Sequence, residues 1–232
     1  MDEKKFVSLK KNELSVRDFV KSSIGKGKIS TVTIEYTPVG EKIVIATSRP
    51  GLVIGKRGER IDELTRVLKK RFGLDNPHID IKEITVPQLD AQIVADDIAL
   101  LLERDGSLKF KVIAYRTLQD IMKAGALGAE ILLSGKLPSE RAKSWRFSQG
   151  YLKKTGDTAK VVNGAMSQAK TLPGVVGIQV RILPPDAHIH DKIVVDSVLR
   201  AKIDANMIAP ILSQVKKEKP RKATRKKKEA SK

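Results

Sequence analysis

The sequence contains no cysteine, which excludes disulfide bonds, thiolate metal sites and cysteine nucleophiles. It also lacks a long apolar run, because a stretch such as Ile98 to Leu102 is far shorter than the roughly 18 residues that span a bilayer. Residues 1–11 mix acidic and basic side chains and lack the apolar centre of a signal peptide, and neither end carries a lipidation motif. We therefore expect a cytoplasmic protein.

Acidic residues are scarce relative to basic ones. The 232 residues include 45 Lys plus Arg and 27 Asp plus Glu, so the formal net charge is +18, which favours a polyanionic partner. Residues 216–232 contribute +8 of this charge, from ten basic and two acidic residues, and leave +10 for residues 1–215. We expect this low-complexity end to be largely disordered from about residue 214. It would add phosphate contacts, with a merely solubilising tail as the alternative.

The remaining chain shows the hydrophobic periodicities of an α/β (α+β) protein with two domains. For the first domain we predict a helix over 16–24, strands over 31–36 and 43–46, a short apolar segment at 52–54, a helix over 59–72 and a strand over 78–86. For the second we predict helices over 89–103 and 108–124, with Ser107 as the N-cap of the latter, and strands over 129–137, 141–153, 158–171 and 175–183.

A loop with the sequence GKRG, Gly55 to Gly58, lies between the apolar segment and the helix at 59–72. Glycine has no Cβ, so a sugar-phosphate backbone can approach the loop closely. The amides at the start of the helix carry positive potential, and Lys56 and Arg57 add charge. The loop and the order α-β-β-α-α-β match the type II KH module, which begins with a helix and clamps about four nucleotides of single-stranded backbone. We expect the groove wall beside the loop to consist of four apolar side chains, namely Ile43, Ile45, Val53 and Ile54.

Neither the other glycine pairs of the sequence nor a P-loop offers a comparable phosphate-binding site. The pairs Gly125/Gly128 and Gly174/Gly177 have the same spacing but enclose apolar residues, so we interpret them as turns at the ends of elements. The segment from Gly51 to Arg57 superficially resembles a P-loop, but it is one residue short. It also has an arginine where magnesium binding needs Ser or Thr.

A second candidate surface is the run RAKSWRFSQGYLKK, residues 141–154. In a strand, Trp145 and Phe147 would share one face with basic residues, and bases interleaved with aromatics suit RNA. The alternative is that both rings pack on the helices and the charges are only solvated. A third candidate is a basic stripe on the helix at 108–124, where Lys109, Arg116 and Lys123 recur every seven residues with Lys111 nearby.

Metal and catalytic chemistry have little support. His188 and His190 flank Ile189 and could place two ligands on one side of a strand, but no further ligand is clustered with them. No Ser/His/Asp set or isolated acid pair is evident. We expect no metal, no cofactor and no enzyme activity.

Several longer segments carry a family resemblance over residues of about 15–183. The segments SRPGLVIGKRGERIDEL, QLDAQIVADDIALLLE, FKVIAYRTLQDIMKAGALGAEILLSGKL and GVVGIQVRIL resemble the family of the third small-subunit ribosomal protein, a universal KH protein. The runs RAKSWRF and GYLKKTGD and the basic end resemble its archaeal and eukaryotic branch.

The resemblance implies a KH domain at 13–87, a domain of two helices on a four-stranded, mainly antiparallel sheet at 88–185, and a basic extension at 186–232. It implies a structural constituent of the small ribosomal subunit that binds ribosomal RNA and neighbouring proteins in the subunit head, and helps form the channel by which messenger RNA enters. In bacterial relatives, basic residues on the helix after the domain boundary help to unwind messenger RNA. The equivalent positions here are Lys111, Val112 and Tyr115, of which only Lys111 is basic.

Two other functions remain open alternatives: a free KH regulator of messenger RNA, and a DNA-lesion endonuclease or lyase of the kind credited to eukaryotic relatives. The RNA-binding residues that we predict are Arg49, Gly55, Lys56, Arg57, Gly58, Arg60, Lys111, Arg116, Lys136, Arg141, Lys143, Trp145, Arg146, Lys153 and Lys154.

Overall fold

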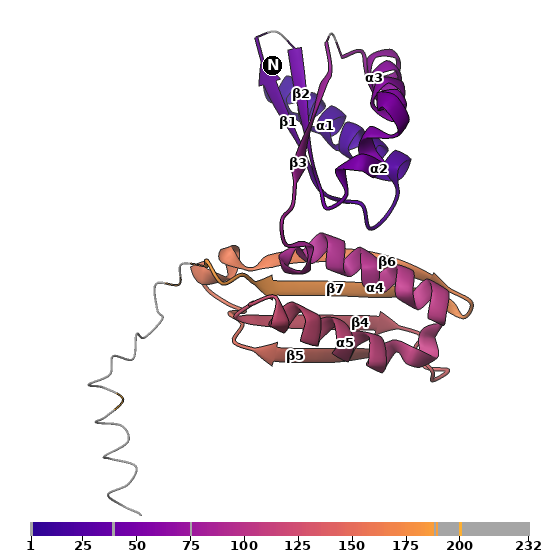
Figure 1. Cartoon of the computed structure of the whole chain (residues 1–232), viewed down its shortest axis with the longest axis vertical. Helices are drawn as coiled ribbons and strands as arrows, with labels where there is room; N and C mark the ends of the chain where they lie inside the picture. Colours follow the sequence, from indigo (N-terminus) through magenta and orange to yellow (C-terminus); the bar gives the residue numbers. More distant parts are fainter. Residues whose placement is uncertain (1, 39, 75, 188, 190–199, 201–232) are drawn as a thin grey trace, which may run out of the picture. The chain divides into compact units, whose positions relative to one another are not determined.

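Two separate β-sheets organise the chain. The computed structural model describes residues 2–38, 40–74, 76–187, 189 and 200. The first sheet has the strand order β1-β2-β3 and the second has the order β5-β4-β7-β6 (Figure 1). The predicted α+β class is confirmed. In the part of the chain that the structure describes, no helix is long and apolar enough to cross a bilayer.

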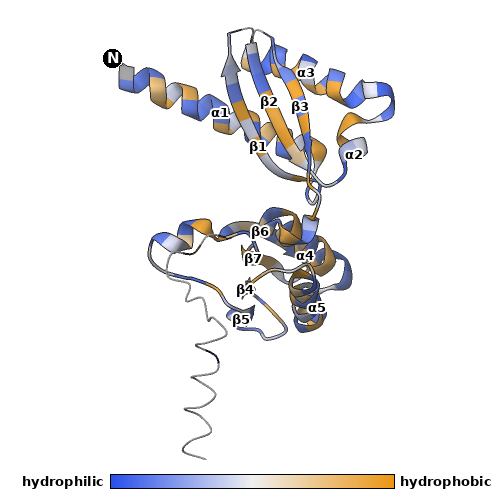
Figure 2. Cartoon of the chain, turned by 60° about the vertical axis from the view of Figure 1, so that its left-hand side comes forward, coloured by the Kyte–Doolittle hydropathy of each residue, from blue (hydrophilic) through white to orange (hydrophobic). Residues whose placement is uncertain are grey.

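The first sheet belongs to a unit with the KH element order. Its elements are α1 (Asp2–Ile24), β1 (Ile29–Thr37), β2 (Gly40–Thr47), α2 (Pro50–Ile54), the 3₁₀ turn η1 (Lys56–Gly58), α3 (Glu59–Phe72) and β3 (His78–Glu83). β1 pairs antiparallel with β2, and β2 pairs parallel with β3. Figure 2 shows α1 and α3 on the same side of this sheet, where Val20, Ile45 and Leu68 share one buried apolar core.

The second sheet is antiparallel throughout. The elements of this part are η2 (Pro87–Leu89), α4 (Ala91–Asp105), η3 (Ser107–Lys109), α5 (Phe110–Lys123), β4 (Gly128–Gly135), β5 (Lys143–Gly150), η4 (Asp157–Val161), β6 (Asn163–Thr171) and β7 (Gly174–Leu183). Both α4 and α5 lie across one face of the sheet (Figure 1). This confirms the predicted arrangement of two helices on four strands.

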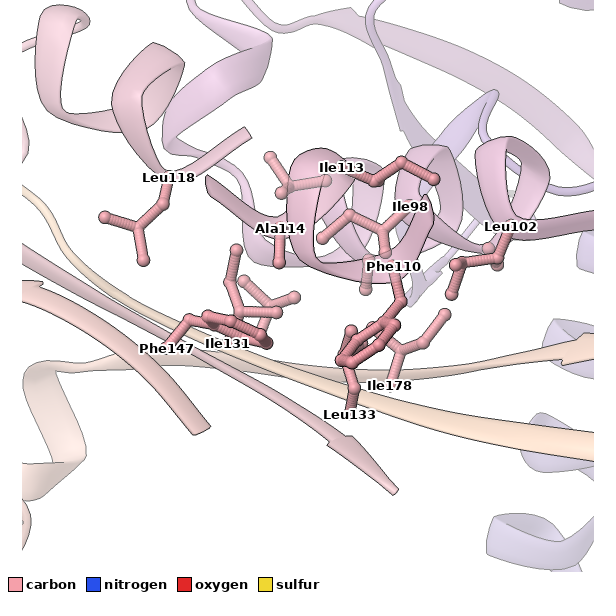
Figure 3. Packing of buried hydrophobic residues seen from close by; sticks show 14 of the residues in the cluster. Ile98, Leu102, Phe110, Ile113, Ala114, Leu118, Ile131, Leu133, Phe147 and Ile178 are labelled. Carbon is pink, nitrogen blue, oxygen red and sulfur yellow. The ribbon is translucent and has the colours of Figure 1, made fainter. Parts of the chain in front are cut away.

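Alternation along the strands decides which side chains meet the helices. In β4, Ile131 and Leu133 point into the core with Phe110 of α5 and Phe147 of β5 (Figure 3). Since successive side chains of a strand point to opposite faces, Glu130, Leu132 and Ser134 belong to the opposite face. We call the face covered by α4 and α5 the inner face and the opposite one the outer face.

The N-terminus of α4 is capped by a residue that the sequence interpretation had overlooked. The Asp90 carboxylate accepts hydrogen bonds from the amides of Gln92 and Ile93, at 2.9 and 3.3 Å, and another from the Ser30 hydroxyl. A further hydrogen bond, 3.1 Å long, runs from the Gly27 amide to Asp96 of α4. Residues 26–30 are thus joined to α4 by polar contacts, while the domain boundaries at 87/88 and 185/186 stay predictions.

Some predicted details of the elements were wrong. Ser107 does not cap the second helix, because residues 107–109 form the 3₁₀ turn η3, and α5 begins at Phe110 with Lys109 as its N-cap. The strand predicted over 158–171 begins at Asn163, after the 3₁₀ turn η4. The strand predicted over 141–153 spans Lys143–Gly150, since Gly150 takes a positive φ of 76° that ends the extended chain.

Candidate nucleic-acid interface

The GKRG loop takes a backbone conformation that needs its glycines. Gly55 has φ 75° and ψ −174°, a region open essentially to glycine alone, and Gly58 is left-handed with φ 84° and ψ 2°. Between them Arg57 has φ 53°, the one positive φ among the described residues other than glycine. The chain therefore turns sharply between α2 and α3, and its two basic residues lie at the outside of the turn.

The two basic side chains of this loop are available to an external anion. Lys56 and Arg57 are exposed. None of the ion pairs identified within the described ranges involves either residue. The α3 helix that follows has no side-chain cap at its N-terminus. Its orphan amides and the two free cations together suit a phosphate group.

The apolar groove wall expected beside this loop was largely wrong. Ile43, Ile45 and Val53 are fully buried in the core of the unit, so their side chains do not reach a bound base. Ile54 is 39% exposed and adjoins Leu52, which is 40% exposed. The apolar surface next to the loop therefore comes from the exposed side of α2.

Arginines on either side of the loop have partners within the protein. The Arg60 guanidinium donates a hydrogen bond of 2.9 Å to the carbonyl of Leu52, and its side chain lies against Gly55. Arg49 is exposed, and its charge acts on Asp97. Burial raises the pKa of Asp97, and the positive charge of Arg49 opposes that rise. Both arginines lie close to the GKRG loop in the sequence, but one donor of Arg60 is already used in the hydrogen bond to Leu52.

The structure brings together two predicted residues that lie 34 positions apart in the sequence. The ammonium of Lys111 in α5 lies 4.8 Å from the centroid of the Trp145 ring in β5, within the range of a cation–π contact. Trp145 is 37% exposed and packs at 5.5 Å against Phe110. The indole is thus fixed by its contact with Phe110 and still partly accessible to solvent.

The other aromatic side chains of this region divide between core and surface. Phe147 is 6% exposed and packs edge-on against Phe110 and Tyr115, so it belongs to the core and not to an RNA-binding face. Tyr115 itself is 59% exposed. Of the two alternatives for the rings, core packing holds for Phe147, while Trp145 both packs on the core and remains partly exposed.

Arg146 and Lys154 lie around a carboxylate that the sequence interpretation had overlooked. Arg146 and Lys154 approach Glu130 Oε1 at 2.8 and 3.0 Å, and Arg181 approaches Oε2 at 3.9 Å. Glu130 is a charged residue that is only 4% exposed, and its neighbours in the strand are apolar. Its place in the apolar run AEILL was the available sequence signal, because a charge inside a strand core needs a partner.

The remaining predicted residues are spread over the second unit. Lys136, Arg141, Lys143 and Arg116 are exposed. Lys153 is half-buried, with its ammonium 5.9 Å from the Tyr151 ring centroid. The structure does not gather them into a single pocket. His188 and His190 lie outside the described residues, and within the described ranges no group of three potential ligands could hold a metal.

Comparisons with known proteins cover nearly the whole described chain. The family model for the KH domain matches residues 15–89, and the model described as "Ribosomal protein S3, C-terminal domain" matches residues 98–182. Three archaeal relatives, each named "Small ribosomal subunit protein uS3", are similar over most of their length. The protein of Methanocaldococcus jannaschii is 41% identical over 84% of this chain and 93% of its own. Those of Methanobrevibacter smithii and Methanothermobacter thermautotrophicus are both 36% identical, over 83% of this chain and 77% and 74% of their own.

Proposed function

Since this chain belongs to the uS3 family of small ribosomal subunit proteins, we propose that it binds ribosomal RNA in the head of the small subunit. It is a constituent of the small ribosomal subunit, as the names of its relatives state for them, and not an enzyme. Binding proceeds by neutralising phosphates, which suits a chain with a formal charge of +18. Neighbouring ribosomal proteins are its other partners, and the cytoplasm is its location.

The observation that carries this proposal is the free pair of cations in the GKRG loop. Lys56 and Arg57 are exposed, flanked by glycines with positive φ, and without an ion-pair partner among the described residues. A sugar-phosphate backbone can therefore approach the main chain and meet both charges at once. Such a loop contributes affinity but little base selectivity, because phosphates carry no sequence information.

We also propose that the surface around Trp145 borders the channel by which messenger RNA enters. Lys111 places its ammonium 4.8 Å from a partly exposed indole, which can stack on an unpaired base, and Lys143, two residues before Trp145 in β5, is an exposed cation. At the neighbouring positions, Val112 and Tyr115 are 67% and 59% exposed. The Tyr115 ring can stack on a base, but neither uncharged side chain binds a phosphate. Messenger unwinding here therefore depends on fewer cations than in bacterial relatives.

A tagged copy of the chain in an archaeal host tests the ribosomal assignment. Cell lysate is separated on a sucrose gradient at low magnesium, which dissociates the subunits, and the chain is detected in each fraction. We expect it with the small subunit. Occurrence in the light fractions alone would overturn the proposal and favour a free KH regulator of messenger RNA. A ribosome-free regulator has no evident need for the second domain, however, and residues 98–182 match a ribosomal one.

A further inference from the structure

The outer face of the second sheet carries mainly polar side chains. Cross-strand pairing places the side chains of its middle part in three rows. The rows are Ser144, Ser134, Gly177 and Gln168; Arg146, Leu132, Gln179 and Met166; and Ser148, Glu130, Arg181 and Gly164. Serines and glycines flank the charged residues on several sides: Ser144 and Ser148 stand beside Arg146 on β5, and Gly164 pairs with Arg181. The helices that contact the sheet, α4 and α5, cover the opposite face.

At the centre of this face, three cations converge on one carboxylate. We call Glu130, Arg146, Lys154 and Arg181 the Glu130 cluster. Glu130 is 4% exposed, whereas the side chains of the three cations are 42–62% exposed. The carboxylate therefore lies beneath, and the positive groups form the surface. Glu130, Arg146 and Arg181 line one surface pocket together with Leu132 and Gln179.

The cluster carries more positive charge than its own carboxylate neutralises. Three cations against one anion leave two positive charges at a single place. Glu130 Oε1 receives the close contacts of Arg146 and Lys154, while Oε2 is buried and accepts no hydrogen bond in the described structure. Arg181, 3.9 Å from Oε2, is too far for one. Its guanidinium thus keeps all of its donors for an external group.

We propose that the Glu130 cluster is a second phosphate-binding site, which holds two neighbouring phosphates of a ribosomal RNA backbone. Arginine presents a planar fork of donors that matches phosphate oxygens. Glu130 holds Arg146 in place before RNA arrives, and Arg181 lies beside it at 3.9 Å from the same carboxylate. Glu130 acts as a positioning residue, since it fixes the cations from below and does not reach the RNA. The inference rests on the proposed binding to ribosomal RNA and adds a face of the molecule separate from the GKRG loop.

The composition of the face favours RNA over a protein partner. The centre of a protein–protein interface is usually apolar and aromatic, and charged residues are depleted there. Here the centre is charged, and the exposed apolar side chains of the face, Met166 on the edge strand β6 and Val175 at the end of β7, lie at its margins. Serine hydroxyls and the Gln179 amide beside the arginines can bond to phosphate and sugar oxygens, as in other nucleic-acid interfaces.

The test compares two double variants of the full chain. Arg146→Gln with Arg181→Gln removes two cations of the cluster, and Arg104→Gln with Lys160→Gln removes two exposed cations elsewhere. Each double variant removes two positive charges, so the two have the same net charge, and Arg104 and Lys160, like the cluster cations, each lie near an acid. Binding to transcribed small-subunit ribosomal RNA is measured over a series of KCl concentrations. The slope of log K against log [KCl] falls in magnitude by about 0.7–0.9 for each phosphate that the protein no longer neutralises.

We expect the slope of the cluster variant to be smaller in magnitude by about 1.4–1.8 and the slope of the control to match the wild type. Equal slopes for the two double variants would overturn the inference. That result is also the one expected if this face binds a protein and not RNA. Absence of salt-dependent binding by the wild type would instead overturn the proposed function. The single variant Arg181→Gln keeps the contacts of Arg146 and Lys154 with Glu130, so we expect it to fold even if the double variant does not. It should reduce the magnitude of the slope by about 0.7–0.9.

Discussion

At the scale of single residues, the two glycines of the GKRG loop differ in what they tolerate. A Cβ at Gly55 would lie 3.0 Å from the Cβ of Arg60, and the backbone there is in a region open essentially to glycine. A Cβ at Gly58 would meet nothing within 4 Å, and its left-handed backbone accepts asparagine. The first glycine is required by space and backbone together, and the second by backbone alone.

We predict that Gly55→Ala destabilises the chain more than Gly58→Ala. The expected losses in free energy of unfolding are about 2–3 kcal/mol for the first and about 1–2 kcal/mol for the second. Gly58→Asn should cost less than Gly58→Ala, because asparagine visits left-handed backbone more readily. Urea denaturation of the purified variants measures all three. Equal losses at the two glycines would contradict the close contact with Arg60.

The residue types of the sequence were enough to identify the loop, but not to tell whether the apolar residues near it are buried or exposed. Two cations between two glycines before a helix indicated an exposed anion-binding turn, and Lys56 and Arg57 are indeed exposed. Ile43 and Ile45 were expected both in a buried strand and in a groove wall. Only the structure decides between these, because it shows that their side of β2 faces the helices.

At the scale of elements, α4 depends on its N-cap. Asp90 accepts hydrogen bonds from two amides of the first turn and from Ser30 of β1. We predict that Asp90→Ala lowers the free energy of unfolding by about 1–2 kcal/mol, whereas Asp90→Asn, which can still cap, loses less. Asp105→Ala at the other end of α4 is the control, since an acid there opposes the helix dipole and its removal should cost little. Thermal unfolding followed by circular dichroism measures the three variants.

Periodicity predicts elements more readily than it predicts their partners. The sequence pattern predicted strands over 129–137 and 175–183, close to the observed bounds of β4 and β7. The approach of Arg181 to Glu130 depends on which strands pair and in what register, and that of Lys111 to Trp145 depends on how α5 packs on the sheet. Such pairing joins residues far apart in the chain, so one sequence does not contain a local signal for it.

At the scale of the whole molecule, low pH should weaken the contact between Glu103 of α4 and Lys170 of β6. The hydrogen bond from the Lys170 amide to Glu103, 2.9 Å long, lowers the pKa of that carboxyl, and the charge of Lys26 lowers it further. A carboxyl with a lowered pKa in the folded state stabilises the fold at neutral pH, and this stabilisation is lost as pH falls through that pKa.

We therefore predict that Glu103→Gln is less stable than the wild type at pH 7 and that the difference shrinks below about pH 4. The control is Glu140→Gln, at an exposed position between β4 and β5. Urea midpoints at a series of pH values measure both variants. A difference that is independent of pH would show that the Glu103 contact does not depend on its charge.

Charge is distributed over the molecule in several separate sites. The GKRG loop lies between α2 and α3, whereas Trp145 and the Glu130 cluster lie on opposite faces of the second sheet. Residues 216–232 add a net +8 outside the described residues. An RNA that contacts all of them is bound through many phosphates, so the loss of any one site weakens binding without abolishing it.

The most direct test of RNA binding through these surfaces is ultraviolet crosslinking of assembled small subunits, with the linked peptides identified by mass spectrometry. We expect nucleotides attached to peptides within residues 49–60 and 141–154, which contain the GKRG loop and the Trp145 strand. Crosslinks confined to residues 216–232 would contradict the account, because they would show that the basic tail alone holds the RNA.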